Sequence, residues 1–169
     1  GPIDDVSSVL KMTLQAKNRE RPYLALAADW VLVSVASGDG ELALSGLWIG
    51  ARDPHAVVLR GDFRRVSLRH VTLDPGGTRA DGAALARVPL RIEGRVEEMR
   101  IESCILAGIT VAPGGLVERL IVQDSIVDAR GGSLALEMDA GEAQLERVTL
   151  FGDSALHRLS ASETLSAGK

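Results

Sequence analysis

The sequence predicts an all-β fold, a right-handed parallel β-helix of about six to seven coils, and three observations predict it. An eleven-residue pattern recurs along the chain, apolar at its fourth and sixth places and small or apolar at its ninth and eleventh. A glycine corner precedes the repeats, and the charge at their third place alternates in sign. A recurring unit of this size is typical of a solenoid, in which each repeat adds one coil to a shared core.

Composition favours one folded domain rich in strands. The chain has 169 residues, 46% of them hydrophobic and 25% charged, which is enough to bury a core and typical of neither a disordered nor a membrane protein. Only 3% are aromatic, so the apolar mass is mainly aliphatic. Small branched side chains suit short repeated strands.

Charge and cysteine content exclude several classes of function. The net charge is −4 with both signs interspersed, so we expect no nucleic-acid partner. Cys104 is the single cysteine, which rules out an intrachain disulfide and a thiolate metal cluster. The apolar runs are too short for a membrane span. Gly1-Pro2 reads like the scar of a cleaved tag, so a targeting segment could have been removed and the compartment is not predicted.

Residues 1–38 are predicted to form an N-terminal cap and the first coils. Within residues 3–15, Asp4-Asp5 could start a short capping helix, or Leu10, Met12 and Leu14 could alternate as a strand. Residues 23–33 are expected to form a further coil. Residues 39–169 then hold the remaining coils of the same domain.

Six segments carry the eleven-residue pattern. They are 39–49 (DGELALSGLWI), 63–73 (FRRVSLRHVTL), 96–106 (VEEMRIESCIL), 117–127 (VERLIVQDSIV), 140–150 (AGEAQLERVTL) and 156–166 (LHRLSASETLS). Alternation within each segment indicates a strand, and its break between the sixth and ninth places indicates a bend. Each interval holds another short apolar run, so a coil has two or three strands, and parallel crossovers favour the right hand. An antiparallel β-sandwich also has short, regularly spaced strands, but has no reason to repeat one pattern six times.

The third place provides a test, because the alignment was built without it. From the first segment to the last it reads Glu41, Arg65, Glu98, Arg119, Glu142, Arg158. If the coils stack in register, opposite charges become neighbours, each pair contributing about 0.2–1 kcal/mol. We expect this column to fix the register, because a slip of one coil would bring like charges together.

The strings VSLRHVTLDPGG, MRIESCILAG, LIVQDSIVDA and LERVTLFGD resemble coils of the right-handed parallel β-helix repeat superfamily, the pectate-lyase-like proteins. The resemblance implies the fold and, more weakly, carbohydrate chemistry. The chain departs from the enzymes of that group. Asn18 is its only asparagine, so there is no asparagine stack, and the segment Arg87–Arg91 is one residue short of the pectate-lyase Arg-x-Pro-x-x-Arg motif.

Ligand-binding candidates lie at three places. Asp124 and Asp128, near a corner, are the least explained acidic pair, with a calcium or sugar role as one reading and a solvated corner as the other. Residues 76–85 (GGTRADGAAL) are predicted to protrude as a loop carrying Arg79 and Asp81. The outward tenth place forms a largely apolar stripe that includes Trp48 and continues through Thr72, Ile105, Ile126, Thr149 and Leu165. Such a stripe marks a packing partner or simply reflects the β-propensity of branched residues.

No residue is predicted to be catalytic, and no cofactor or metal is predicted. His70 and Asp124 share the eighth place but lie two coils apart, too far for a catalytic hydrogen bond. Cys104 stands at the inward ninth place and reads as a buried filler. The acidic residues lie mostly at outward places beside arginines, which lower a carboxyl pKa.

The sequence therefore predicts a non-catalytic structural or binding module that presents a rigid face to a partner, within a larger assembly in one reading. One expected partner is a protein that packs on the apolar stripe. Another is a second copy at a solenoid end, since no C-terminal cap follows the last repeat. A glycan is the other candidate. The alternatives are a carbohydrate-binding or polysaccharide-degrading β-helix protein, and a trimmed or synthetic scaffold.

Overall fold

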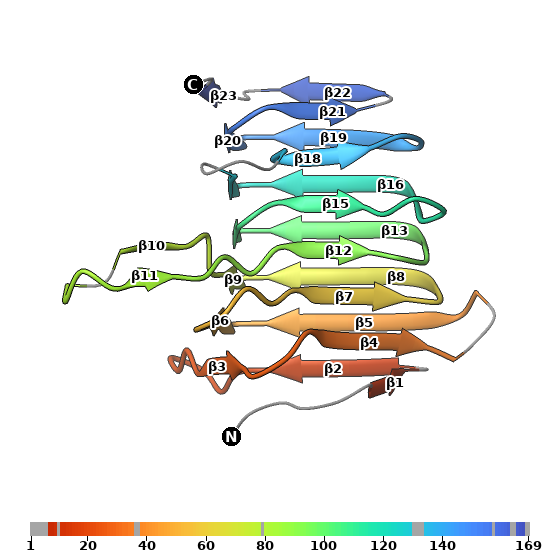
Figure 1. Ribbon diagram of the computed structural model, residues 1–169. Coiled ribbons are helices and arrows are strands. Elements are labelled where there is room, and N and C mark those ends of the chain that lie inside the picture. The colour runs from red at the N-terminus through yellow and green to blue at the C-terminus, as the bar shows by residue number, and fades with distance from the viewer. Residues whose placement is uncertain are drawn as a thin grey trace.

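A computed structural model describes residues 7–9, 11–35, 38–78, 80–129, 134–156, 158–162 and 165–167. These residues contain strands and no helix. Three seven-stranded sheets, each parallel throughout, make up the body of the molecule, and one antiparallel hairpin stands beside it (Figure 1). The coarser prediction, an all-β chain of parallel strands, is confirmed. The β-sandwich alternative is wrong, because its strands would pair antiparallel.

The first sheet contains the short strands between repeats. In spatial order they are β1 (Ser7–Val9), β4 (Trp30–Ser34), β7 (Val57–Arg60), β12 (Leu90–Ile92), β15 (Ile109–Val111), β18 (Leu136–Met138) and β21 (Ser154–Leu156). The second sheet contains the first half of each repeat. Its strands are β2 (Lys11–Gln15), β5 (Gly40–Ser45), β8 (Asp62–Arg69), β13 (Arg95–Glu102), β16 (Leu116–Gln123), β19 (Glu142–Glu146) and β22 (Leu159–Ser162).

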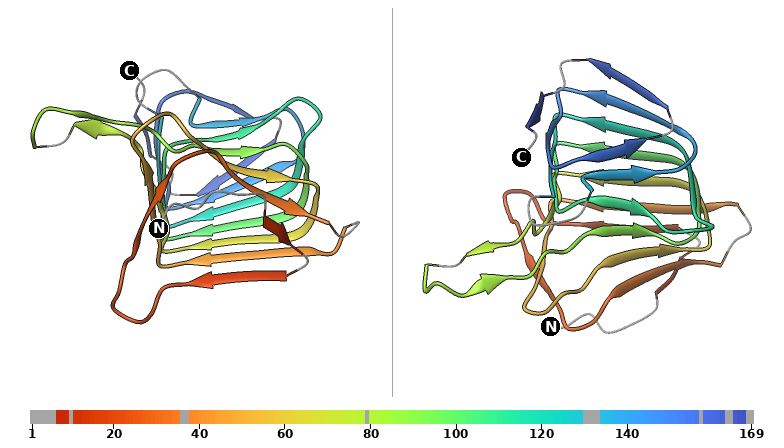
Figure 2. Two further views of the ribbon diagram at one scale, coloured as in Figure 1. Left: turned by 60° about the horizontal axis from the view of Figure 1, so that its bottom comes forward. Right: turned by 45° about the horizontal axis from the view of Figure 1, so that its top comes forward.

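The third sheet contains the second half of each repeat. Its strands are β3 (Tyr23–Leu26), β6 (Trp48–Ala51), β9 (Thr72–Leu73), β14 (Ile105–Leu106), β17 (Ile126–Asp128), β20 (Thr149–Phe151) and β23 (Leu165–Ala167). The chain passes from the first sheet to the second, then to the third, and repeats this cycle seven times. β1–β4, from the segment predicted as cap and first coils, join the same three sheets as the rest (Figure 2).

The inward places of the pattern are stacked columns of buried aliphatic side chains. The fourth place is buried at Leu42, Val66, Met99, Leu120 and Ala143, and the sixth at Leu44, Leu68, Ile101, Val122 and Leu145. The ninth and eleventh places are equally buried from the first repeat to the fifth. Because each buried aliphatic side chain contributes about 1.5–3 kcal/mol before entropy is subtracted, these columns supply most of the stabilisation.

The bend between the sixth and ninth places has a common backbone conformation. The eighth-place residue has a positive φ in five successive repeats: Gly46 (72°), His70 (53°), Ser103 (54°), Asp124 (49°) and Arg147 (52°). A left-handed residue turns the chain sharply without interrupting the hydrogen bonds between coils, such as Ser103 N–H to Gln123 O at 3.1 Å. The bend inferred from the broken alternation therefore has a backbone cause.

Glycine is required at the other corner, before each repeat, because successive coils approach closely there. A Cβ at Gly94 would collide with the backbone of Gly61, and a Cβ at Gly141 would collide with that of Val117. These two corner glycines thus make room for the backbone of the neighbouring strand.

The N-terminal region resolves one alternative that the sequence left open. Residues 11–15 form strand β2, with Met12 and Leu14 packed partly against the core. The strand reading is confirmed there, while residues 1–6 and Leu10 lie outside the described residues. None of the described residues belongs to a helix that could span a bilayer.

The described residues of the 76–85 segment do protrude. β10 (Gly77–Thr78) and β11 (Ala84–Leu85) pair antiparallel and extend sideways from the stack (Figure 1). An antiparallel bridge between Ala51 and Ala86 ties the base of this hairpin to the end of β6.

Candidate functional site: an aromatic cleft beside the hairpin

A cleft of about 800 Å³ opens at the edge of the third sheet, where β3 and β6 meet the base of the hairpin. Its walls combine aromatic, aliphatic and charged side chains. They are Tyr23, Ala25, Leu26, Ala27, Trp48, Ala51, Arg52, Asp53, Asp74 and Leu85. A concave site with an apolar lining and a few polar groups is the usual form of a ligand site.

Tyr23 and Trp48 form an aromatic corner in this cleft. They are register neighbours on the adjacent parallel strands β3 and β6, so the sheet itself sets their separation. The ring centroids are 5.4 Å apart and the ring planes meet at 88°, the edge-to-face geometry favoured by the ring quadrupoles. Tyr23 is 50% exposed and Trp48 is 42% exposed, so each ring offers surface to a ligand.

Gly50 provides the space that the Tyr23 ring occupies. A Cβ at position 50 would lie 2.5 Å from the Tyr23 hydroxyl oxygen and 3.0 Å from its ring carbon Cζ. An alanine there would push the tyrosine out of its present orientation. The aromatic corner therefore depends on a glycine that neither turns the chain nor has a positive φ.

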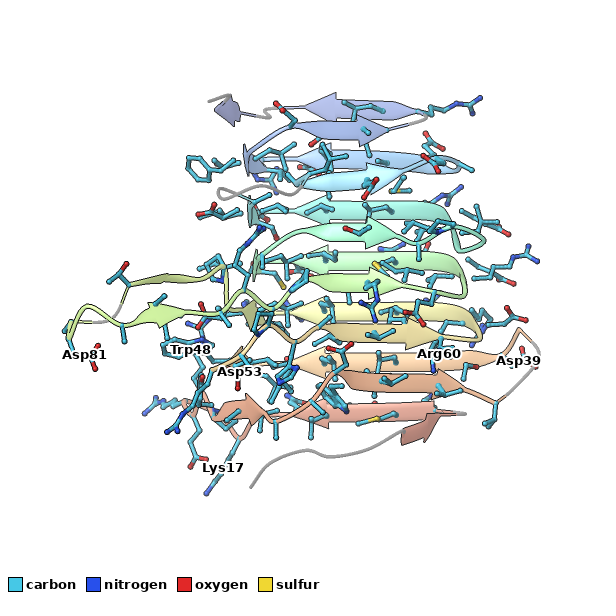
Figure 3. All side chains as sticks on the ribbon, viewed as in Figure 1. Lys17, Asp39, Trp48, Asp53, Arg60 and Asp81 are labelled. Atoms are coloured by element: carbon cyan, nitrogen blue, oxygen red, sulfur yellow. The ribbon has the colours of Figure 1, made fainter. Side chains whose placement is uncertain are left out.

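Two carboxylates and one guanidinium line the same cleft. Asp74 is buried at the end of β9, and its Oδ1 accepts a hydrogen bond from Gly76 N–H at 3.0 Å, at the entry to the hairpin. Arg52 and Asp53 are exposed in the turn after β6. Neither side chain makes an ion pair or hydrogen bond with another described residue. Trp48 and Asp53 lie on the side of the stack from which the hairpin projects (Figure 3).

The sequence-predicted residues fall at separate places. Trp48 lies in the cleft, whereas Asp81 lies at the far tip of the hairpin, where its Oδ1 accepts Ala83 N–H at 3.0 Å (Figure 3). Arg79 lies outside the described residues. Asp124 and Asp128 lie in different parts of the backbone. Asp124 is at the left-handed bend, and Asp128 is at the end of β17.

Asp124 is engaged in an ion pair. Arg147, one coil further along at the same eighth place, donates from Nε at 2.6 Å and from Nη2 at 3.0 Å to its two carboxylate oxygens. These hydrogen bonds lower the pKa of Asp124 below its ordinary value. The main-chain oxygen of Asp128 accepts a long contact of 3.4 Å from Arg87. The binding role assigned to these aspartates stays a prediction.

The tenth place forms one column on the outer face of the third sheet. Register pairs run Tyr23–Trp48–Thr72–Ile105–Ile126–Thr149–Leu165. Trp48, Ile105 and Ile126 are exposed, but Thr72 is only 8% exposed. Arg21, from the segment between β2 and β3, donates to the Thr72 hydroxyl and covers it. The apolar stripe is therefore divided into an aromatic part at the cleft and an aliphatic part on β14 and β17.

The charged third-place residues are direct neighbours on the outer face of the second sheet. Register pairs join Glu41 to Arg65, Arg65 to Glu98, Glu98 to Arg119 and Arg119 to Glu142. Ala143 N–H donates to the main-chain oxygen of Arg158, which carries the column onto β22. Arg65 Nε lies 3.3 Å from Glu98 Oε1.

The column begins one strand earlier than the sequence analysis placed it. Lys11 on β2 pairs in register with Glu41, and its Nζ lies 3.2 Å from the Glu41 carboxylate. Arg64 also reaches Glu41 from the neighbouring strand. Six charges therefore alternate in sign over the six strands β2 to β19, and Arg158, directly before β22, continues the alternation.

Cys104 is unsuited to nucleophilic chemistry. The side chain is buried at the ninth place, and burial raises the pKa of the thiol to about 11. Its Sγ lies 3.2 Å from Glu102 O and receives Val71 N–H at 3.4 Å, so the thiol packs and hydrogen-bonds within the wall. Within the described ranges no three His, Cys, Asp or Glu side chains are grouped closely enough to hold a metal ion.

Sequence reasoning missed Tyr23, Asp53 and Asp74 as partners of Trp48. Extending the eleven-place register back by one coil would have placed Tyr23 at the tenth place, but an insertion between β2 and β3 hides the alignment. Asp53 and Asp74 follow strands β6 and β9 at the same edge of the third sheet, so their proximity to the cleft is a property of the stack.

No family model matches the chain, and neither a curated protein nor a solved structure is significantly similar to it.

Proposed function

We propose that the three sheets are the walls of a right-handed parallel β-helix, similar to the pectate-lyase-like solenoids, and that this helix is a non-catalytic binding module. The support for the solenoid is the unbroken cycle of the chain through three parallel sheets. Parallel crossovers are right-handed in nearly all proteins, which gives the hand. A crystal structure in which the chain winds left-handed would overturn this part of the proposal.

The binding function is carried by one observation, the half-exposed Tyr23–Trp48 corner in a cleft on an otherwise regular stack. Strand pairing sets the spacing of the two residues, and the rings pack edge to face, so less side-chain entropy is lost on binding than for two separate rings. The hairpin adds a wall through Leu85 without belonging to the three main sheets. A rigid scaffold with one decorated cleft suits recognition of a partner.

A carbohydrate-binding or carbohydrate-degrading role is the second candidate. The specific observation that favours it is the presence of two aromatic rings and two carboxylates, Asp53 and Asp74, in one cleft. A degrading enzyme generally requires a carboxyl with a raised pKa facing a second carboxylate across the sugar. The carboxyl pKa shifts resolved in this chain, for Glu93, Glu98, Asp124 and Glu146, are all downward.

A ligand screen with two readouts tests the proposal. The wild type and Trp48→Ala would be screened by thermal shift against glycans and small metabolites, with lyase and hydrolase assays on the same glycans. We expect at least one compound class to raise the Tm of the wild type and not of Trp48→Ala, without turnover, because ligand binding to the native state stabilises it. Turnover by the wild type that is lost in Asp53→Asn would replace the binding function with an enzymatic one.

The aliphatic part of the stripe, Ile105 and Ile126, is the proposed contact for a protein partner. Association of copies through the solenoid ends is a separate proposal.

A further inference from the structure

We propose that the aromatic cleft binds an alkylated ammonium cation, a trimethylammonium group of the kind that choline carries. This inference rests on the proposed binding function and names the chemistry of its ligand. Three features of the cleft support it: the angle between the rings, the balance of charge and the aliphatic part of the lining.

The ring angle favours a cation over a sugar. A sugar stacks on one flat aromatic face, whereas a cation gains from each ring face that lies within about 6 Å of it. Tyr23 and Trp48 meet at 88° and therefore present no common platform. With centroids 5.4 Å apart, a small group seated in the angle between the rings can approach both centroids to within about 6 Å.

The charges of the cleft favour the same ligand. Asp53 and Asp74 outnumber Arg52, so the lining carries a net negative charge. The Asp53 carboxylate has no ion-pair partner among the described residues, and it is exposed at the mouth. Such a site attracts a cation and disfavours a phosphate or a carboxylate ligand.

The remaining lining suits methyl groups. Ala25, Leu26, Ala27, Ala51 and Leu85 provide aliphatic surface and no side-chain hydrogen-bonding group. A sugar hydroxyl against this surface would lose its hydrogen bonds to water without replacement, which costs free energy. A trimethylammonium group has no hydrogen-bond donor to leave unsatisfied and buries its methyl groups there.

Choline and its neutral isostere, in which carbon replaces the ammonium nitrogen, provide a matched pair of probes. Titration would be followed by NMR through the two tryptophan indole N–H signals. Trp48 lines the cleft, while Trp30 is buried in the core and serves as an internal reference. We expect choline to shift the Trp48 signal with an affinity at least tenfold above that of the isostere, leaving Trp30 unchanged.

Variants titrated by isothermal calorimetry locate the site, because substitution of Trp48 removes its NMR signal. Trp48→Ala should abolish binding, Trp48→Phe should retain it because the ring face persists, and Asp53→Asn should weaken choline binding about threefold to tenfold while leaving the isostere unaffected. Ile105→Ala is the matched control, since it removes an exposed apolar side chain from the same column outside the cleft. Its affinity for choline should equal that of the wild type.

The outcomes separate the two proposals. Equal affinity for choline and the isostere, or unchanged choline affinity in Asp53→Asn, would overturn the cation inference and leave a binding cleft standing. A neutral oligosaccharide that shifts Trp48 where choline does not would also overturn it, in favour of the glycan alternative. If neither choline nor any compound of the thermal-shift screen acts through Trp48, both the inference and the proposed binding function fail.

Discussion

At the scale of the residue, the eighth place shows how the sequence controls the bend between sheets. Four non-glycine residues adopt positive φ there, although a left-handed conformation costs an L-residue about 1–2 kcal/mol. The fold tolerates this free-energy cost because the chain has to bend at the eighth place of each of these repeats. Among the five residues with positive φ at this place, only Gly46 adopts the left-handed conformation without that cost.

Ser103→Gly is therefore expected to stabilise the protein by about 1 kcal/mol, since glycine adopts φ near 54° without steric cost. Urea denaturation gives the measurement. Ser67→Gly, in the middle of strand β8, is the control and should destabilise by about 0.5–1 kcal/mol. Destabilisation of similar size by both substitutions would show that the bend stores no strain.

Glu98 gives the stability a defined pH dependence. Hydrogen bonding to Arg100, and then its charge and that of Arg65, lowers the pKa of Glu98 below 4.5. Because the folded-state pKa is the lower one, this stabilisation is complete above about pH 4.5 and is lost as the pH falls through the folded-state value. Glu98→Gln should therefore lose less stability than the wild type between about pH 5 and pH 3.

The measurement for Glu98 is thermal unfolding across that pH range. Glu97→Gln is the control, because Glu97 lies on the same strand and makes no ion pair with another described residue. A parallel acid profile for wild type and Glu98→Gln would contradict the assignment.

At the scale of the element, the charged column favours one register between neighbouring strands. From β2 to β19, each strand of the second sheet contributes one charge at the third place, opposite in sign to those on either side. The apolar columns alone accept a shift of one whole coil almost equally well, because the same places are aliphatic in every repeat. The alternating charges do not tolerate such a shift, so they specify the register that the apolar core alone leaves open.

Glu98→Arg should consequently cost about 1–2 kcal/mol at low salt, since the favourable pairs with Arg65, Arg100 and Arg119 become like-charge contacts. The loss should shrink at high salt. Chemical denaturation at two ionic strengths measures it. Glu137→Arg is the matched control, because its register neighbours are Thr110 and Ala155, and it should change stability by less than about 0.5 kcal/mol.

At the scale of the whole molecule, the proposed solenoid is expected to have a stability that is a sum over coils and their neighbours. Met99 lies in the centre of the fourth-place column and is fully buried, whereas Leu159 occupies the same place on β22 and is 52% exposed. A fourth-place side chain therefore contributes more to the free energy of unfolding in the middle of the stack than at its C-terminal end. Local opening is expected to begin at the β21–β23 coil.

Met99→Ala should cost about 2–5 kcal/mol and Leu159→Ala less than about 1 kcal/mol, because only the former leaves a cavity. Calorimetry measures the difference. Amide hydrogen exchange should also be slower in β13 and β16 than in β22. Equal exchange rates throughout the stack would indicate one all-or-none unit in place of coupled coils.

The column of charges also bears on association through the solenoid ends. Head-to-tail stacking in register would place Arg158 of one copy beside Lys11 of the next, two cations in contact. Salt screens this repulsion, so light scattering should show such association increase from about 0.02 M to about 0.5 M salt. Lys11→Glu should associate at low salt, and association that weakens as salt rises would contradict in-register stacking.

The sequence by itself determined the strands, the bends and the register, because each of them follows from a local repeat: apolar places, a glycine corner and an alternating charge. It also predicted a protruding loop, whose antiparallel pairing only the structure shows, and named Trp48 as a binding candidate. The cleft was decided only by tertiary structure. Tyr23, Asp53 and Asp74 are separated from one another by up to about fifty residues in the chain and converge because parallel stacking brings successive coils to one sheet edge. An insertion before β3 removes the local signal for Tyr23, and no periodicity in a sequence encodes the angle at which two rings meet.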